Sequence, residues 1–198
     1  TTASNNTTVG YGSLGLNTTG GDNTSVGYNV MAANTTGEQN VAFGSNALDA
    51  NTTGHYNTAL GRSALGSATT ASNNTAVGFN SLVANTTGTQ NVAVGSVALD
   101  ANTTGLDNTA VGYASLSANT TGARNTSMNN ALGANTSGND NIALGHFALA
   151  NSTTASNNTA VGKSALFANT TGAQNVAVGT SCMLVNTEGS DNIAMGVS

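Results

Sequence analysis

The sequence predicts an all-β protein, a parallel β-solenoid or β-roll in which one repeat of seventeen residues makes one coil. Three observations lead to this fold class. A seventeen-residue pattern recurs along the whole chain, each repeat holds one short β-branched and apolar segment closed by Gly, and proline is absent. A helical repeat is a poor alternative, because seventeen residues cannot hold two helices with their turns, and Gly, Asn and Thr are weak helix formers.

The repeat is N-T-T-G-x-x-N-T-A-V-G-x-x-A-L-x-A, and its positions are numbered 1 to 17 from the first Asn. Twelve copies follow one another. The first lacks position 1 and covers residues 1–16, the last is incomplete, and the copy at 119–134 is one residue short. We therefore expect residues 1–198 to form a single continuous solenoid, an excerpt of a longer fibre. Its further coils start at residues 17, 34, 51, 68, 85, 102, 119, 135, 152, 169 and 186.

Position 7 is Asn in every copy, which predicts a stack of identical side chains. Coils of a parallel solenoid lie ~4.8 Å apart, so twelve coils span roughly 58 Å. At that spacing each Asn amide can bond to the same residue in the next coil and form a ladder. The expected ladder consists of Asn6, Asn23, Asn40, Asn57, Asn74, Asn91, Asn108, Asn125, Asn141, Asn158, Asn175 and Asn192.

Positions 8 to 10 predict the strand of each coil, because they are β-branched, small and apolar in turn. Side chains alternate along a strand, so position 9 faces the narrow interior while positions 8 and 10 face outward. Positions 14 and 15 are expected to supply a second short extended piece, and N-T-T-G to form a corner. Asn129 replaces the position-11 Gly in the short copy, so a local distortion is expected near residues 128–131.

One coil offers only about three apolar side chains for burial, at positions 8 or 9, 10 and 15. The free energy gained by burying them is small beside the conformational entropy lost when seventeen residues become ordered. We therefore expect a second face to be buried between chains, with a monomer as the alternative.

The repeats "NVAVGSVALDANTTG" (91–105) and "NTAVGYASLSANTTG" (108–122) resemble the head repeats of trimeric autotransporter adhesins, the YadA-like head, and related repeats of trimeric phage tail fibres. The shared core is N/S-x-A-V/I-G-x-x-A, and the resemblance covers essentially the whole chain, although the family's repeat is usually shorter, at fourteen residues. It implies a left-handed β-roll, a homotrimer, and a place on a cell surface or in a virion tail fibre.

Composition argues against several other functions. Charged residues make up 6% of the chain and the net charge is −5, too little positive charge to grip nucleic acid. No apolar run approaches the ~18 residues of a membrane span, so no membrane insertion is expected. Cys182 is the single cysteine and excludes an internal disulfide.

No pattern of catalytic or metal-binding residues is visible. His55 and His146 occupy different repeat positions, five coils or roughly 25 Å apart in a stacked rod. The acidic residues of position 6 never fall in adjacent coils, and they are too sparse for a calcium cage. We expect no enzyme activity, no metal and no cofactor.

Position 12 holds half of the aromatic residues and two of the three basic residues. One interpretation is an exposed recognition stripe for a glycan or another surface polymer. The other is that a position after a Gly turn tolerates bulk and packs against the neighbouring coil or chain. The residues concerned are Tyr11, Tyr28, Arg62, Phe79, Tyr113, His146 and Lys163.

The sequence thus favours a structural or adhesive fibre segment, an adhesin head or a tail-fibre shaft, that projects or forms a surface for a host glycan or protein receptor. The alternative is a monomeric solenoid that binds ice or carbohydrate through a flat face. The Thr pairs at positions 2 and 3 are adjacent, so we expect them on opposite faces, which disfavours an ice-binding array.

Overall fold

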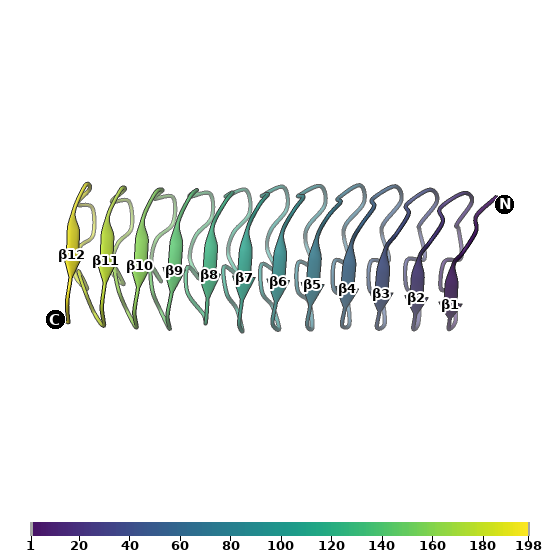
Figure 1. Cartoon of the computed structure of the whole chain (residues 1–198), viewed down its shortest axis with the longest axis horizontal. Helices are drawn as coiled ribbons and strands as arrows, with labels where there is room; N and C mark the ends of the chain where they lie inside the picture. Colours follow the sequence, from purple (N-terminus) through teal and green to yellow (C-terminus); the bar gives the residue numbers. More distant parts are fainter. Residues whose placement is uncertain (1, 198) are drawn as a thin grey trace.

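The computed structural model describes residues 2–197 and has one strand in each coil. The strands stack side by side in sequence order as one parallel twelve-stranded sheet, and no helix occurs among the described residues. Figure 1 shows the resulting straight rod, with the chain termini at its two ends. The strands are β1 (Thr7–Val9), β2 (Thr24–Val26), β3 (Val41–Phe43), β4 (Thr58–Leu60), β5 (Thr75–Val77), β6 (Val92–Val94), β7 (Thr109–Val111), β8 (Thr126–Met128), β9 (Ile142–Leu144), β10 (Thr159–Val161), β11 (Val176–Val178) and β12 (Ile193–Met195).

The register of the sheet keeps equivalent repeat positions side by side. Thr75 of β5 is paired with Val92 of β6, and Ala76 with Ala93. The Thr75 N–H donates to the Asn91 carbonyl at 2.8 Å, and the same bond recurs along the stack. Every strand therefore needs its N–H groups, which is consistent with the absence of proline. The parallel β-solenoid of about twelve seventeen-residue coils is confirmed.

The alternation expected within the strand is also confirmed. Ala93, at position 9, is fully buried, whereas Val94, at position 10, is 36% exposed. The expectation that position 10 adds to the core of a coil is wrong, because that side chain lies on the outer face of the sheet. The core is built instead from the small residues of positions 9 and 14 and the Leu or Met of position 15.

The second extended piece expected at positions 14 and 15 is absent. These positions lie in consecutive turns, and Leu99 at position 15 has φ 51°. Every position-15 residue from Leu14 to Met183 shares this left-handed conformation, which costs an L-residue roughly 1–2 kcal/mol. It aims the side chain into the roll, where complete burial of a Leu contributes about 1.5–3 kcal/mol and offsets the strain.

The Asn ladder of position 7 is confirmed, and each rung makes more bonds than expected. Asn91 Nδ2 donates to Asn74 Oδ1 at 3.2 Å and to the carbonyl of Gly105 in the next coil at 2.9 Å. Asn91 Oδ1 accepts the backbone N–H of Asn108 at 3.0 Å and its Nδ2 at 3.1 Å. The side-chain bond recurs at every step from Asn23 to Asn192. The ladder thus satisfies buried polar groups that a core this thin cannot avoid.

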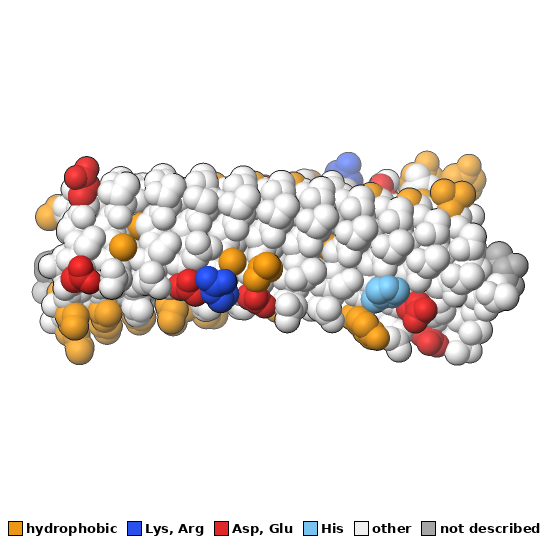
Figure 2. Space-filling model, turned by 90° about the horizontal axis from the view of Figure 1, so that it is seen from above, with side chains coloured by type: hydrophobic (Ala, Val, Ile, Leu, Met, Phe, Trp, Pro, Cys, Tyr) orange, Lys and Arg blue, Asp and Glu red, His pale blue; other side chains and the backbone are white. Residues whose placement is uncertain are grey.

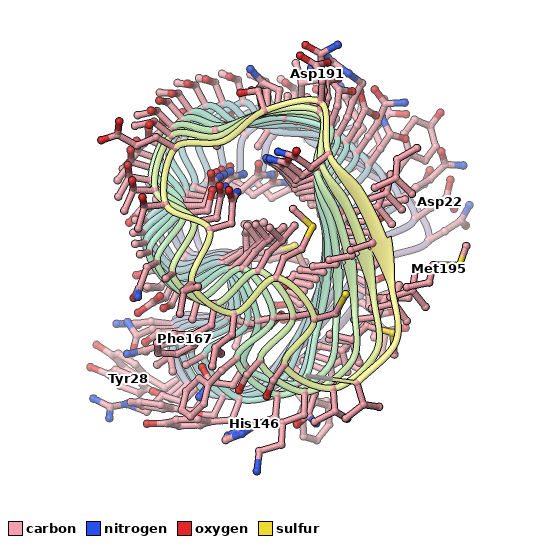
Figure 3. All side chains as sticks on the ribbon, turned by 90° about the vertical axis from the view of Figure 1, so that its left-hand side faces the viewer. Asp22, Tyr28, His146, Phe167, Asp191 and Met195 are labelled. Carbon is pink, nitrogen blue, oxygen red and sulfur yellow. The ribbon has the colours of Figure 1, made fainter. Side chains whose placement is uncertain are left out.

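Position 1 forms a second Asn ladder that the sequence analysis did not anticipate. Asn102 Nδ2 donates to Asn85 Oδ1 at 2.8 Å and to the carbonyl of Gly105 at 3.0 Å. This ladder is interrupted where position 1 is Ala68 or Ser152. Figure 3, along the rod axis, shows both sets of stacked amides inside the roll, above the stacked aliphatic side chains.

The distortion expected near residues 128–131 is present and stays local. Asn129 has φ 64°, whereas the Gly residues of position 11 have φ between 121° and 138°. The Gly145 N–H to Met128 carbonyl distance is 3.4 Å, long beside 2.8 Å for Gly162 and Leu144 in the next coil. Strand pairing continues undisturbed, with Thr126 next to Ile142. The short coil omits position 12, since Asn130 has the left-handed φ typical of position 13.

Candidate functional site

The seven residues predicted at position 12 lie along one edge of the rod, immediately after the strands. All seven side chains are exposed, and Tyr11 and Tyr113 are 77% and 68% exposed. Figure 3 shows Tyr28 and His146 on this lower edge, pointing away from the roll. The structure therefore places the predicted residues on one surface.

The column is divided into short groups. Tyr11 and Tyr28 stack with ring centroids 5.6 Å apart and planes 12° apart. The Arg62 guanidinium lies 5.6 Å from the centroid of the Phe79 ring, a cation–π contact. Both pairs join consecutive coils, as the packing interpretation requires, yet all four side chains remain accessible, as recognition requires.

Tyr113 is separated from the rest of the column. The preceding coil has Ser96 at position 12, and the following coil has no residue at that position. His146 and Lys163 follow in the next two coils. The column thus offers several small patches rather than one continuous stripe.

Two aromatic residues beside this column were missed by the sequence analysis. Phe147 follows His146 at position 13, and its ring centroid lies 3.9 Å from that of His146. Phe167, at position 16, contacts Phe147 with a centroid distance of 6.3 Å. Neither position is aromatic elsewhere in the chain, so the repeat pattern gave no reason to join them to position 12.

The outer face of the sheet is a second candidate surface. Position 10 is apolar in every coil, and position 8 is Thr, Val or Ile. Neither position carries a charge. In Figure 3 Met195 marks this face, on a different side of the roll from Tyr28, Phe167 and His146. The most exposed apolar members of the two columns are Val9, Val41, Phe43, Leu60, Val94, Met128, Ile142, Val178, Ile193 and Met195.

Charged groups are few on the rod. Figure 2 shows a long face covered mainly by uncharged polar side chains and backbone. Arg124 and Asp140 of adjacent coils form an exposed bidentate ion pair, with Nε–Oδ1 and Nη2–Oδ2 distances of 2.7 and 2.9 Å. The hydrogen bonds and charge of Arg124 lower the pKa of Asp140, and Asp140 raises the pKa of Arg124.

The histidines and the cysteine serve local contacts. His55 Nδ1 accepts the backbone N–H of Glu38 at 3.0 Å, and the buried Cys182 thiol lies 3.3 Å from the Ala194 carbonyl. Within residues 2–197, no three His, Cys, Asp or Glu side chains gather as metal ligands would. No helix in the same range could cross a membrane.

Comparison with known proteins identified no relative of this chain. The chain matched no protein-family model, no curated protein and no solved structure.

Proposed function

We propose that this chain is a segment of a homotrimeric fibre on a cell surface or virion, where it projects or forms a surface for a glycan or protein receptor. The observation that supports this proposal is the uncharged outer face of the twelve-stranded sheet, with its apolar column at position 10. The left-handed winding and the number of chains are taken from the resemblance of the repeats to trimeric adhesin heads and tail fibres.

The chemistry of the sheet face favours a protein partner. Phe43 and Met128 are 59% and 43% exposed in the single chain, and the whole position-10 column is apolar. Three residues by twelve strands make a strip about 10 Å wide and roughly 58 Å long. Within this uncharged strip the position-10 column is a continuous apolar row, and exposed apolar surface of this kind typically marks an interaction site.

The regular register makes a second copy of the chain the best partner. Equivalent residues recur once per coil along a straight rod, so parallel copies can meet along their full length without a change of spacing. A strip that faces a threefold axis contacts both neighbouring chains, and this buries the second face that a thin coil lacks.

Sedimentation equilibrium tests this proposal. The expected mass is about 58 kDa, three times the 19.3 kDa of the chain, and a mass of 19.3 kDa would contradict it. The double variant Val94→Lys with Val111→Lys places two charges on the strip and should sediment as a monomer. Its control, Thr87→Lys with Thr104→Lys, places the same charges on exposed position-3 residues of neighbouring coils and should remain trimeric.

A second function, ice binding, gains support from the Thr pairs. N-T-T-G is a bend rather than a strand, so the strand alternation behind the expectation of opposite faces does not apply to positions 2 and 3. Position 2 is half-buried in most coils, and position 3 is exposed. The exposed hydroxyl column comprises Thr2, Thr19, Thr36, Thr53, Thr70, Thr87, Thr104, Thr121, Ser137, Thr154 and Thr171.

Thermal hysteresis of the purified protein tests ice binding. A concentration-dependent signal that Thr87→Lys with Thr104→Lys abolishes would support it and displace the fibre proposal. The absence of hysteresis at high protein concentration would remove it.

A further inference from the structure

The short coil creates a hollow on the edge of the rod. Because that coil omits position 12, no side chain fills the column between Tyr113 and His146. Its position 16 is Gly133, and a Cβ built there meets no heavy atom within 4 Å. A Cβ on Gly66, the same position of a regular coil, would lie 3.3 Å from the Ser63 carbonyl oxygen. The missing side chain at Gly133 therefore leaves this space open, beside the gap in the position-12 column.

Residues of three successive coils surround the hollow, called here the notch. Its volume is about 370 Å³, and its lining includes Asn130, Gly133, Phe147, Asn151 and Phe167. Ligand sites typically occupy about 300–1,000 Å³, so the notch suits a small ligand or the end of a longer one.

Two phenyl rings form the walls of the notch. The planes of Phe147 and Phe167 are inclined at 76°, edge to face. Phe147 is 39% exposed and Phe167 is half-buried. The rings thus stand nearly at a right angle beside the open space above Gly133, and each can contact a flat apolar group.

The polar part of the lining comes from two amides. Asn130 and Asn151 each carry one acceptor oxygen and an NH₂ donor. No residue of the lining bears a carboxylate, an ammonium or a guanidinium group. The site therefore favours a neutral ligand with both hydroxyl groups and an apolar face.

We infer that the notch binds the ring of a neutral saccharide. The C–H face of a pyranose packs against an aromatic ring, while its hydroxyls exchange hydrogen bonds with amides. This inference names the class of ligand that the proposed receptor-binding surface would recognise, and its biological role rests on the proposed function. The notch lies on the edge marked by Phe167 and His146, away from the sheet face marked by Met195 (Figure 3). The two sites can therefore be tested separately.

Saturation-transfer NMR on the whole chain tests the inference. The probes are the methyl β-glycosides of glucose, galactose and N-acetylglucosamine, with the anionic N-acetylneuraminic acid as comparison. We expect saturation transfer to at least one neutral glycoside, with a Kd on the order of 1 mM, and a weaker signal for the anion.

Matched variants assign the signal to the notch. Gly133→Phe fills it and should remove at least nine-tenths of the transfer, whereas Gly66→Phe makes the same change in a regular coil and should leave the signal intact. Phe167→Leu should weaken binding several-fold, since position 16 accepts Leu184 in the next coil. Tyr56→Leu, which removes an exposed aromatic ring outside both the notch and the position-12 column, is its control. Circular dichroism verifies that each variant is folded.

Several outcomes would overturn the inference. These are no transfer to any neutral glycoside, equal transfer in wild type and Gly133→Phe, or preference for the anionic sugar. The fibre proposal fails independently: a 19.3 kDa wild type that still binds a glycoside refutes the trimer alone, and a 58 kDa wild type without binding refutes the notch alone.

Discussion

Ser152 lies one coil beyond Asn135 in the position-1 column, and the Asn135 Oδ1 and Ser152 Oγ atoms are both buried without a hydrogen bond. Elsewhere an Asn at position 1 donates its amide to the preceding Asn, as Asn102 does to Asn85. Position 4 explains the gap. A Cβ on Gly88 would collide with Asn85 Oδ1, and where position 1 is Ala68 or Ser152, position 4 is Ala. Asn at position 1 and a side chain at position 4 therefore exclude each other.

This exclusion predicts strong coupling between residues 152 and 155. Ser152→Asn alone should destabilise the protein by about 1–3 kcal/mol, because the new amide overlaps the Ala155 methyl group. With Ala155→Gly, the Asn can donate to Asn135 Oδ1 and to the carbonyl of residue 155, at about 0.5–1.5 kcal/mol for each bond. A double-mutant cycle by urea unfolding should give a coupling energy of about 1–3 kcal/mol in favour of the pair. Additive effects would contradict the exclusion.

The position-7 ladder predicts unequal effects of one substitution at two adjacent residues. Asn74 is 1% exposed and donates to Asn57 Oδ1 at 3.2 Å and to the Gly88 carbonyl at 2.9 Å. Asn74→Asp replaces these donors with a buried carboxylate and should cost about 3–5 kcal/mol of unfolding free energy. Asn73→Asp should be nearly neutral, because position 6 is exposed and already accepts Asp107. Thermal unfolding at neutral pH measures the stability of both variants. An equal loss of unfolding free energy in the two would show that the ladder does not contribute to stability.

Substitution of Gly by Ala should affect stability differently at positions 11 and 16. Gly95 has φ 138°, and an added Cβ would lie 2.6 Å from the Gly112 carbonyl carbon. Gly95→Ala should therefore cost about 3 kcal/mol or more. Gly133→Ala meets open space and should stabilise the protein by about 0.4–1 kcal/mol, since it restricts the unfolded chain. Chemical unfolding of the two variants decides, and a larger loss at Gly133 would show that the short coil is packed differently.

The ion pair of Arg124 and Asp140 predicts a change in titration with little change in stability. Arg124 holds the pKa of Asp140 below its ordinary value, first through the hydrogen bond and then through its charge. Because the pKa of Asp140 is lower in the folded than in the unfolded chain, the ion pair contributes to stability above the unfolded pKa of about 4. This contribution is lost as the pH falls through the folded pKa. Arg124→Gln should raise the pKa of Asp140, as followed by ¹³C NMR of its carboxyl group. Arg62→Gln should leave that titration unchanged, and an unchanged titration in Arg124→Gln would exclude the pair in solution.

Much of the candidate site could be predicted in outline. The position-12 residues share a surface because equal repeat positions stack, so counting repeat positions, with the short copy allowed for, located Tyr11 and Lys163 on the same edge. The notch could not be found in this way. It depends on which position the short coil omits and on how Phe147 and Phe167, from different positions, meet across two coils.

Repetition along the chain is enough to predict the stacking: the coil length, the inward face of each strand and the Asn ladder of position 7. Each of these depends on a residue meeting its own equivalent one coil away, so repetition alone reveals it. The path of the backbone within a coil, by contrast, became known from the three-dimensional fold. Contacts between different repeat positions produce the left-handed conformation of Leu99 and the position-1 Asn ladder. They also make that ladder depend on a Gly at position 4, such as Gly88. Such contacts depend on backbone dihedral angles. The repeat pattern does not reveal these angles, because Leu occurs both in turns and in strands.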